Sequence, residues 1–128
     1  MKAQISAEFM FYISILLIIM SFATFFAIVT GNDLRTESIN TDAKRLAAAV
    51  ATEINTAVEV GDGYSRNFFL PQTVYGSINY TIDILYQRVY IYWEGRSYSL
   101  PVLAYNITGS PAKGYTTIRN SNGVIVFV

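Results

Sequence analysis

Residues 4–29, QISAEFMFYISILLIIMSFATFFAIV, decide the fold of this 128-residue chain. Between Phe9 and Val29 the stretch holds no charged residue and no proline, and it is long enough to cross a bilayer as one helix. A secretory signal peptide would have a shorter apolar region that ends in a small-residue cleavage site, whereas this run continues into further helical pattern. Glu8 stands directly before the apolar run, where a carboxylate is costly unless it reaches water or a partner. The stretch therefore predicts a membrane-spanning N-terminal helix.

The charges that flank the apolar run bear on its orientation. Lys2 and the amino terminus precede the run, and Asp33, Arg35 and Glu37 follow it. The positive-inside rule then favours a cytoplasmic N-terminus and an external C-terminus.

The helical pattern resumes beyond Thr30–Asp33, a candidate break because it contains Gly31. In residues 34–60 the apolar side chains recur every three or four positions and form one stripe. The stripe consists of Ile39, Ala43, Leu46, Ala47, Val50, Ile54, Ala57 and Val58. We therefore expect one helix over about residues 4–60, kinked if anywhere near Gly31, and ended by the glycines of residues 61–63.

The pattern beyond residue 63 is that of β-strands. Residues 77–85, SINYTIDIL, alternate apolar and polar side chains. Residues 88–102, RVYIYWEGRSYSLPV, form a hairpin if Glu94–Gly95 is the turn, because this register alone separates apolar from polar side chains. It pairs Trp93 with Arg96, Ile91 with Tyr98, Val89 with Leu100, Tyr92 with Ser97, and Tyr90 with Ser99. A second hairpin turns at Asn122–Gly123 with an apolar, central last strand, and short strands near residues 66–70 and 103–108 complete the sheet.

The β region has only about 65 residues and no disulfide, which is marginal for independent stability. The apolar stripe of the helix also needs a surface to cover. Both needs are met if the stripe packs on the sheet. The expected fold is α+β, with a long hydrophobic and amphipathic N-terminal helix packed on a small antiparallel β-sheet or sandwich head.

The start of the quoted stretch, QISAEF, resembles the class III signal sequences of archaeal type IV pilin-like proteins, which begin Q-x-S-x-E-F. The residues that carry the resemblance are Gln4, Ser6, Glu8 and Phe9. The resemblance implies cleavage by a prepilin peptidase between Ala3 and Gln4, which makes Glu8 the fifth residue of the mature chain. It also implies a leader over 1–3, a transmembrane and filament-core helix over 4–30, an amphipathic extension over 31–60, and a β head over 61–128.

The same resemblance implies a structural role. Proteins of this family insert in the cytoplasmic membrane, N-inside, and assemble into surface filaments with the helices bundled in the core. The implied partners are the membrane, further copies of the chain, the prepilin peptidase, and the assembly ATPase and platform, with Glu8 acting in assembly. Two alternatives stay open: a minor pilin or pseudopilin of an assembly or secretion machine, and a single-span anchor for a β domain that binds at the surface.

Composition argues against other functions. The formal net charge is +0, so no basic surface favours a nucleic-acid partner, and the chain has no cysteine or histidine for thiol, imidazole or most transition-metal chemistry. The acids of the β region, Asp62, Asp83 and Glu94, are expected on a cap, a strand and a turn. We therefore expect no enzyme, no cofactor and no metal site.

Two surface features of the β region remain. Tyrosines are frequent there, which strand propensity explains, but Tyr90 and Tyr92 fall on the polar face of the hairpin and are candidates for subunit contact or adhesion.

Asn79 and Asn106 begin N-x-[ST] sequons. An external β region makes both candidate glycosylation sites, with Asn106, near a turn, the better one.

Overall fold

The computed structural model describes residues 1–128 apart from the side chain of Lys2. Helix α1, Lys2–Val60, is continuous through Gly31, so the candidate break at residues 30–33 is not present. A glycine inside a helix costs only about 1 kcal/mol relative to alanine, which is too little to break a helix that continues for many residues on both sides. The chain divides into two compact units, Met1–Glu37 and Ser38–Val128, which are described separately below.

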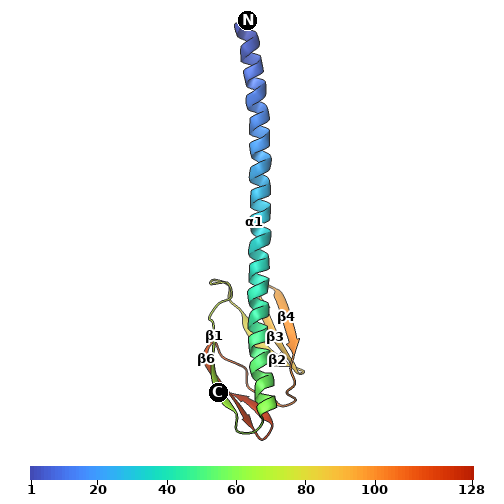
Figure 1. Ribbon diagram of the computed structural model, residues 1–128, viewed down its shortest axis with the longest axis vertical. Coiled ribbons are helices and arrows are strands. Elements are labelled where there is room, and N and C mark those ends of the chain that lie inside the picture. Colours follow the sequence, from blue (N-terminus) through green and yellow to red (C-terminus); the bar gives the residue numbers. More distant parts are fainter. The chain divides into compact units, whose positions relative to one another are not determined.

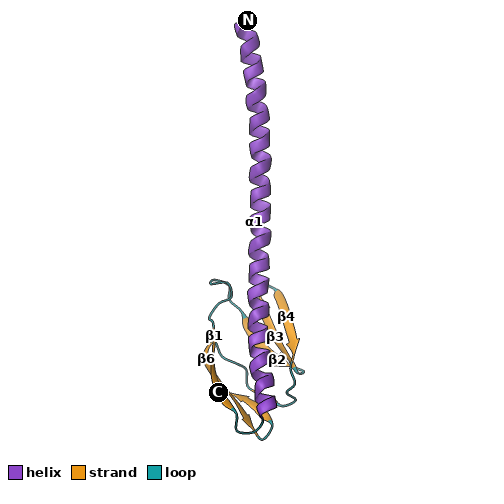
Figure 2. Ribbon diagram, viewed as in Figure 1, coloured by secondary structure: helices purple, strands orange, loops and turns teal.

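The strands of the second unit form two small sheets (Figures 1 and 2). The strands are β1 (Ser65–Leu70), β2 (Thr81–Leu85), β3 (Arg88–Trp93), β4 (Arg96–Pro101), β5 (Ile107–Thr108), β6 (Gly114–Ser121) and β7 (Val124–Phe127). One sheet has the order β1-β6-β7-β5 and the other the order β2-β3-β4. The β2-β3-β4 sheet is a meander with two-residue turns, whereas in the other sheet β1 pairs with β6, far along the chain.

The second half of α1 packs on these sheets through the predicted stripe. Seven of its residues are buried: Ile39, Ala43, Leu46, Ala47, Val50, Ile54 and Ala57. Val58 is half-buried against the same core, and that core also contains Val89 and Ile91 of β3 and Ile118 and Ile125 of the other sheet. Burying a side chain such as Val50 or Ile54 contributes roughly 1.5–3 kcal/mol. The stripe therefore joins both sheets into one core, as the sequence pattern predicted.

The β3–β4 hairpin has the predicted register. Trp93 pairs with Arg96, and the pairing continues in step to Arg88 and Pro101. Glu94 and Gly95 both have positive φ, 43° and 74°, which is the geometry of a two-residue turn that matches strand twist. The side chains sort as expected, because Val89 and Ile91 are buried while Tyr92 is exposed.

Two of the predicted strands differ from the structure. Only residues 81–85 of the stretch 77–85 are in a strand, because Ile78 forms an isolated bridge with Val74 and so closes a loop. Only Ile107–Thr108 of residues 103–108 are in a strand, and β5 runs parallel to β7. The sheet is therefore mixed rather than antiparallel. The parallel pair is possible because β6 carries the chain back, so that β7 again points along β5.

The C-terminal hairpin turns at Asn122–Gly123 as predicted, and β7 lies in the interior of its sheet. Asn120, which is buried, ties this hairpin to the end of α1. Its Nδ2 donates to the carbonyl oxygen of Ala57 at 2.8 Å, and its Oδ1 accepts from the N–H of Gly123 at 3.0 Å. The Ala57 carbonyl lies in the last turn of the helix and also accepts from the N–H of Gly61 at 3.3 Å, so Asn120 is its second donor.

Asn120→Ala is expected to lower the free energy of unfolding of this unit by about 1–3 kcal/mol, because it removes both hydrogen bonds of a buried side chain that joins the hairpin to the helix. Urea unfolding monitored by circular dichroism measures the change. The control is Asn67→Ala on β1, whose side chain is exposed and accepts from Thr117, and which should change stability by no more than about 0.5 kcal/mol. Equal losses in the two variants would contradict the role given to Asn120.

Candidate functional site

The first unit presents an uninterrupted exposed surface. Every described side chain from Ala3 to Arg35 is exposed, including those of Phe9, Leu17 and Phe26. By length and composition, α1 is long and apolar enough to cross a membrane. Such a surface is much larger than the apolar patches that monomeric soluble proteins expose. It needs lipid or another apolar surface to cover it.

The hydroxyl groups within the apolar run have partners inside the helix. Ser14 Oγ donates to the carbonyl oxygen of Met10 at 2.8 Å, Ser21 Oγ to that of Leu17 at 2.8 Å, and Thr24 Oγ1 to that of Met20 at 2.9 Å. This bonding four residues back is a common way for serine and threonine to satisfy their hydroxyls inside a helix. These three residues therefore add no unpaired hydroxyl donor to a segment that lies in an apolar environment.

The residues of the signal-like motif lie at the start of this helix. Gln4, Ser6, Glu8 and Phe9 are all helical and exposed, and Gln4 and Glu8 are four residues apart, on one face. The Ala3–Gln4 bond lies in the first turn of α1. The N–H groups of a first turn have no acceptor within the helix, so this turn unwinds at lower cost than the interior.

The Glu8 carboxylate is exposed and makes no ion pair with the side chains that the structure describes. Among the described side chains, the one ion pair is in the other unit, where Arg66 Nη1 lies 3.2 Å from Glu53 Oε1. Within the folded chain, therefore, none of the described side chains provides a positive charge next to Glu8. Water or another molecule can supply the partner that the described side chains do not.

The head tyrosines take up different positions. Tyr80 is buried and donates its hydroxyl to the carbonyl oxygen of Pro71, and burial raises its pKa to about 12, so the phenol stays protonated at neutral pH. Tyr90 and Tyr92 lie side by side on the outer face of β3, with ring centroids 6.1 Å apart and planes at 9°. Tyr92 is exposed and Tyr90 is half-buried. Three tyrosines outside the predicted pair are much more exposed: Tyr86, Tyr105 and Tyr115.

Both sequon asparagines have exposed side chains, as modification would require. Asn79 Oδ1 accepts from the Nζ of Lys113 and, at 3.2 Å, from the N–H of Tyr80. Asn106 lies just before β5, and its carbonyl oxygen accepts from the N–H of Ile125 at 2.9 Å. The Asn79 side chain is therefore the more constrained of the two.

The acids of the β region lie on separate elements. Asp62 Oδ1 accepts from the N–H of Asn122 at 2.7 Å, Asp83 is on β2, and Glu94 is in the β3–β4 turn. In the part of the chain that the structure describes, no three acidic side chains come together as metal ligands. Asp62 fastens the helix end to the C-terminal hairpin, which is a structural task.

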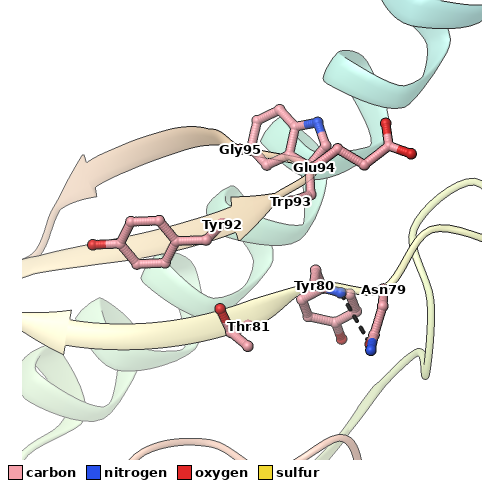
Figure 3. A pocket seen from close by; sticks show the side chains of 7 residues that line it. All are labelled: Asn79, Tyr80, Thr81, Tyr92, Trp93, Glu94 and Gly95. Carbon is pink, nitrogen blue, oxygen red and sulfur yellow. Dashed lines mark hydrogen bonds between the residues drawn. The ribbon is translucent and has the colours of Figure 1, made fainter.

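Sequence reasoning did not find the two hollows beside Trp93. The first, about 200 Å³, is lined by Asn79, Tyr80, Thr81, Tyr92, Trp93, Glu94 and Gly95 (Figure 3). The second, about 410 Å³, lies on the α1 side and is lined by Asn40, Lys44, Trp93, Arg96, Ser97 and Tyr98. No short motif marks either one, since the second joins a helix face to a hairpin some 50 residues later.

Comparison with known proteins does not assign the chain to a family. No family model, no curated protein and no solved structure gave a significant match to it.

Proposed function

We propose that the chain is a structural subunit of an archaeal type IV pilus-like surface filament, made as a membrane-inserted precursor and assembled through its N-terminal helix. The observation that carries the proposal is the exposed apolar surface from Phe9 to Val29, with the QISAEF motif directly at its start. The resemblance implies the route of cleavage and assembly. The exposed apolar surface is the physical reason why the chain needs a membrane first and neighbouring helices later.

The exposed run requires an apolar environment at every stage. Each large side chain gains roughly 1.5–3 kcal/mol on leaving water, so exposing the whole run would cost on the order of tens of kcal/mol. Lipid meets this need in the precursor. In a filament, the same side chains pack against the helices of neighbouring subunits. Moving from lipid to the filament core exchanges one apolar contact for another, so the free energy of the apolar run changes little.

The orientation and location follow from the same reading. Lys2 and the amino terminus stay on the cytoplasmic side, where the peptidase, the assembly ATPase and the platform protein act. The β head then lies outside and faces the surroundings once the subunit is assembled. Exposed tyrosines such as Tyr92 and Tyr105 are available there for contacts with neighbouring subunits or surfaces.

A single-span anchor for a surface β domain is the second candidate. The exposed apolar run supports it equally well, because lipid alone covers that run. Mass spectrometry of sheared surface filaments separates the candidates. Stoichiometric amounts of the chain indicate a main subunit, amounts near those of the assembly proteins indicate a minor pilin or pseudopilin, and absence indicates the anchor.

Processing provides the first test of the proposal. The intact mass of the chain from its native host is expected to lack Met1, Lys2 and Ala3, with or without cyclisation of the new terminal Gln4. Replacement of Gln4 or deletion of the peptidase should leave the longer form. Filaments that contain the uncut precursor would contradict the assignment to this family.

A further inference from the structure

The second hollow beside Trp93 lies between α1 and the β3–β4 hairpin, and the polar groups around it are mainly hydrogen-bond donors. Its charged residues are Lys44 and Arg96, and none of its lining residues is acidic. Ser97 and Tyr98 add hydroxyl groups. The lining comes from three elements, α1, the end of β3, and β4, so hydrogen-bond donors approach the space from different sides.

The contacts already made within the hollow leave most of its donors available. Arg96 Nη1 donates to Asn40 Oδ1 at 3.2 Å, which occupies the carbonyl oxygen of the Asn40 amide and leaves its N–H donors. Lys44 Nζ lies 5.8 Å from the centroid of the Tyr98 ring and forms no ion pair among the described side chains. The hollow thus has an excess of donors over acceptors and a local positive charge.

Trp93 provides an independent observation. Its side chain is 5% exposed, and its Nε1 is buried without a hydrogen-bond partner among the described residues. A buried donor without an acceptor costs about 1–3 kcal/mol. In Figure 3 the indole nitrogen points away from Tyr80 and Asn79, on the side where Glu94 lies, and Trp93 also lines the second hollow. An acceptor that reaches the nitrogen from the second hollow would remove this penalty.

We propose that this hollow binds a small tetrahedral oxyanion, phosphate or sulfate. Such an ion has acceptor oxygens directed to several sides, which matches donors from three elements, and the planar guanidinium of Arg96 can bind two of its oxygens at once. Because Nε1 is buried, an ion in the hollow reaches it only after neighbouring side chains shift, and the long side chains of Lys44 and Arg96 are exposed and free to do so. The site is independent of the proposed assembly role.

One acid beside the hollow limits the affinity. Glu94 is the neighbour of Trp93 in the β3–β4 turn. Its negative charge opposes an anion, so we expect binding at millimolar rather than micromolar concentration, and tighter binding when the Glu94 charge is removed. Removal of the Glu94 charge should therefore strengthen binding, whereas removal of the Lys44 or Arg96 charge should weaken it.

The experiment uses the full chain in a non-ionic detergent and the fluorescence of Trp93, the only tryptophan. Phosphate and sulfate are titrated separately, with sodium chloride adjusted to hold the ionic strength constant. A saturable spectral change is expected with either ion. Lys44→Gln and Arg96→Gln should each weaken binding about tenfold, and Glu94→Gln should strengthen it severalfold.

The matched control is Arg88→Gln on β3, which removes an exposed arginine from the same sheet but outside the hollow, where it donates to Ser99. It should leave the affinity unchanged. Trp93→Phe, measured by calorimetry, keeps an aromatic ring in the core and should weaken binding severalfold. The absence of a saturable response, equal weakening by Arg88→Gln and Arg96→Gln, or unchanged affinity in Trp93→Phe would each overturn the proposal.

Discussion

Glu8→Ala is expected to reduce incorporation of the chain into filaments about a hundredfold or more, while membrane insertion and the stability of the β head stay unchanged. In the membrane, the carboxylate lies at the edge of the apolar run and reaches water near the interface. In a filament core that route is closed. A buried carboxylate without a partner costs several kcal/mol, so assembly must supply a partner.

The partner implied by the resemblance is the amino terminus of a neighbouring subunit. After cleavage, Glu8 lies about one helical turn from the new terminus at Gln4, which is cationic unless Gln4 cyclises. If it does cyclise, Ser6 or the free N–H groups of the first turn can take the place of the amine. Alanine at position 8 leaves the neighbour's donor buried and unpaired, and loss of one member of a buried pair typically costs 3–5 kcal/mol, hence the large expected effect.

The measurement compares the amount of each variant in sheared filaments with the amount in the membrane. Glu37→Ala is the matched control, because it removes an exposed glutamate from the same helix beyond the apolar run and should assemble normally. Glu8→Gln keeps hydrogen bonding without the charge and should give intermediate incorporation. Wild-type incorporation of Glu8→Ala would make Glu8 an interfacial residue only and would favour the single-span anchor.

The elements that could be predicted from the sequence are those with local signals. The apolar stripe follows from helical spacing, and both glycine-containing hairpins follow from turn residues that tolerate positive φ. The β2–β3 turn could not be found this way. Its two residues, Tyr86 and Gln87, adopt positive φ of 50° and 58°, although neither is a glycine or an asparagine. Tertiary pairing of β2 with β3 imposes that conformation.

Features that depend on the assembled fold were also missed. The parallel pairing of β5 with β7 depends on where the chain returns after β6, and two residues of strand carry no signal for it. The motif at Gln4–Phe9 could be read directly because its residues are contiguous. The hollow of Lys44, Trp93 and Arg96 could not, because only packing of α1 on the β3–β4 hairpin brings these residues together.

The second large effect concerns the contribution of α1 to the head. A fragment of residues 33–128 is expected to fold as a soluble monomer with one cooperative unfolding transition, whereas residues 61–128 alone should aggregate or stay unfolded. Eight of the twenty buried hydrophobic residues in the core come from α1. Removal of the helix also breaks the hydrogen bond of Asn55 Oδ1 with the N–H of Leu103 and that of Asn120 with Ala57. These losses together exceed the few kcal/mol by which so small a domain is stable.

A pair of adjacent alanines tests the same point without truncation. Ala47 is fully buried against the sheets, and Ala48 is exposed on the other side of the helix. Within the 33–128 fragment, Ala47→Asp places an unpaired carboxylate in the core and should unfold the fragment at 25 °C, because its cost of several kcal/mol matches the total stability. Ala48→Asp should change the urea midpoint only slightly. A soluble, cooperatively folded 61–128 fragment, or equal tolerance of aspartate at both positions, would show that the sheets form their core without α1 and that the stripe is not what stabilises them.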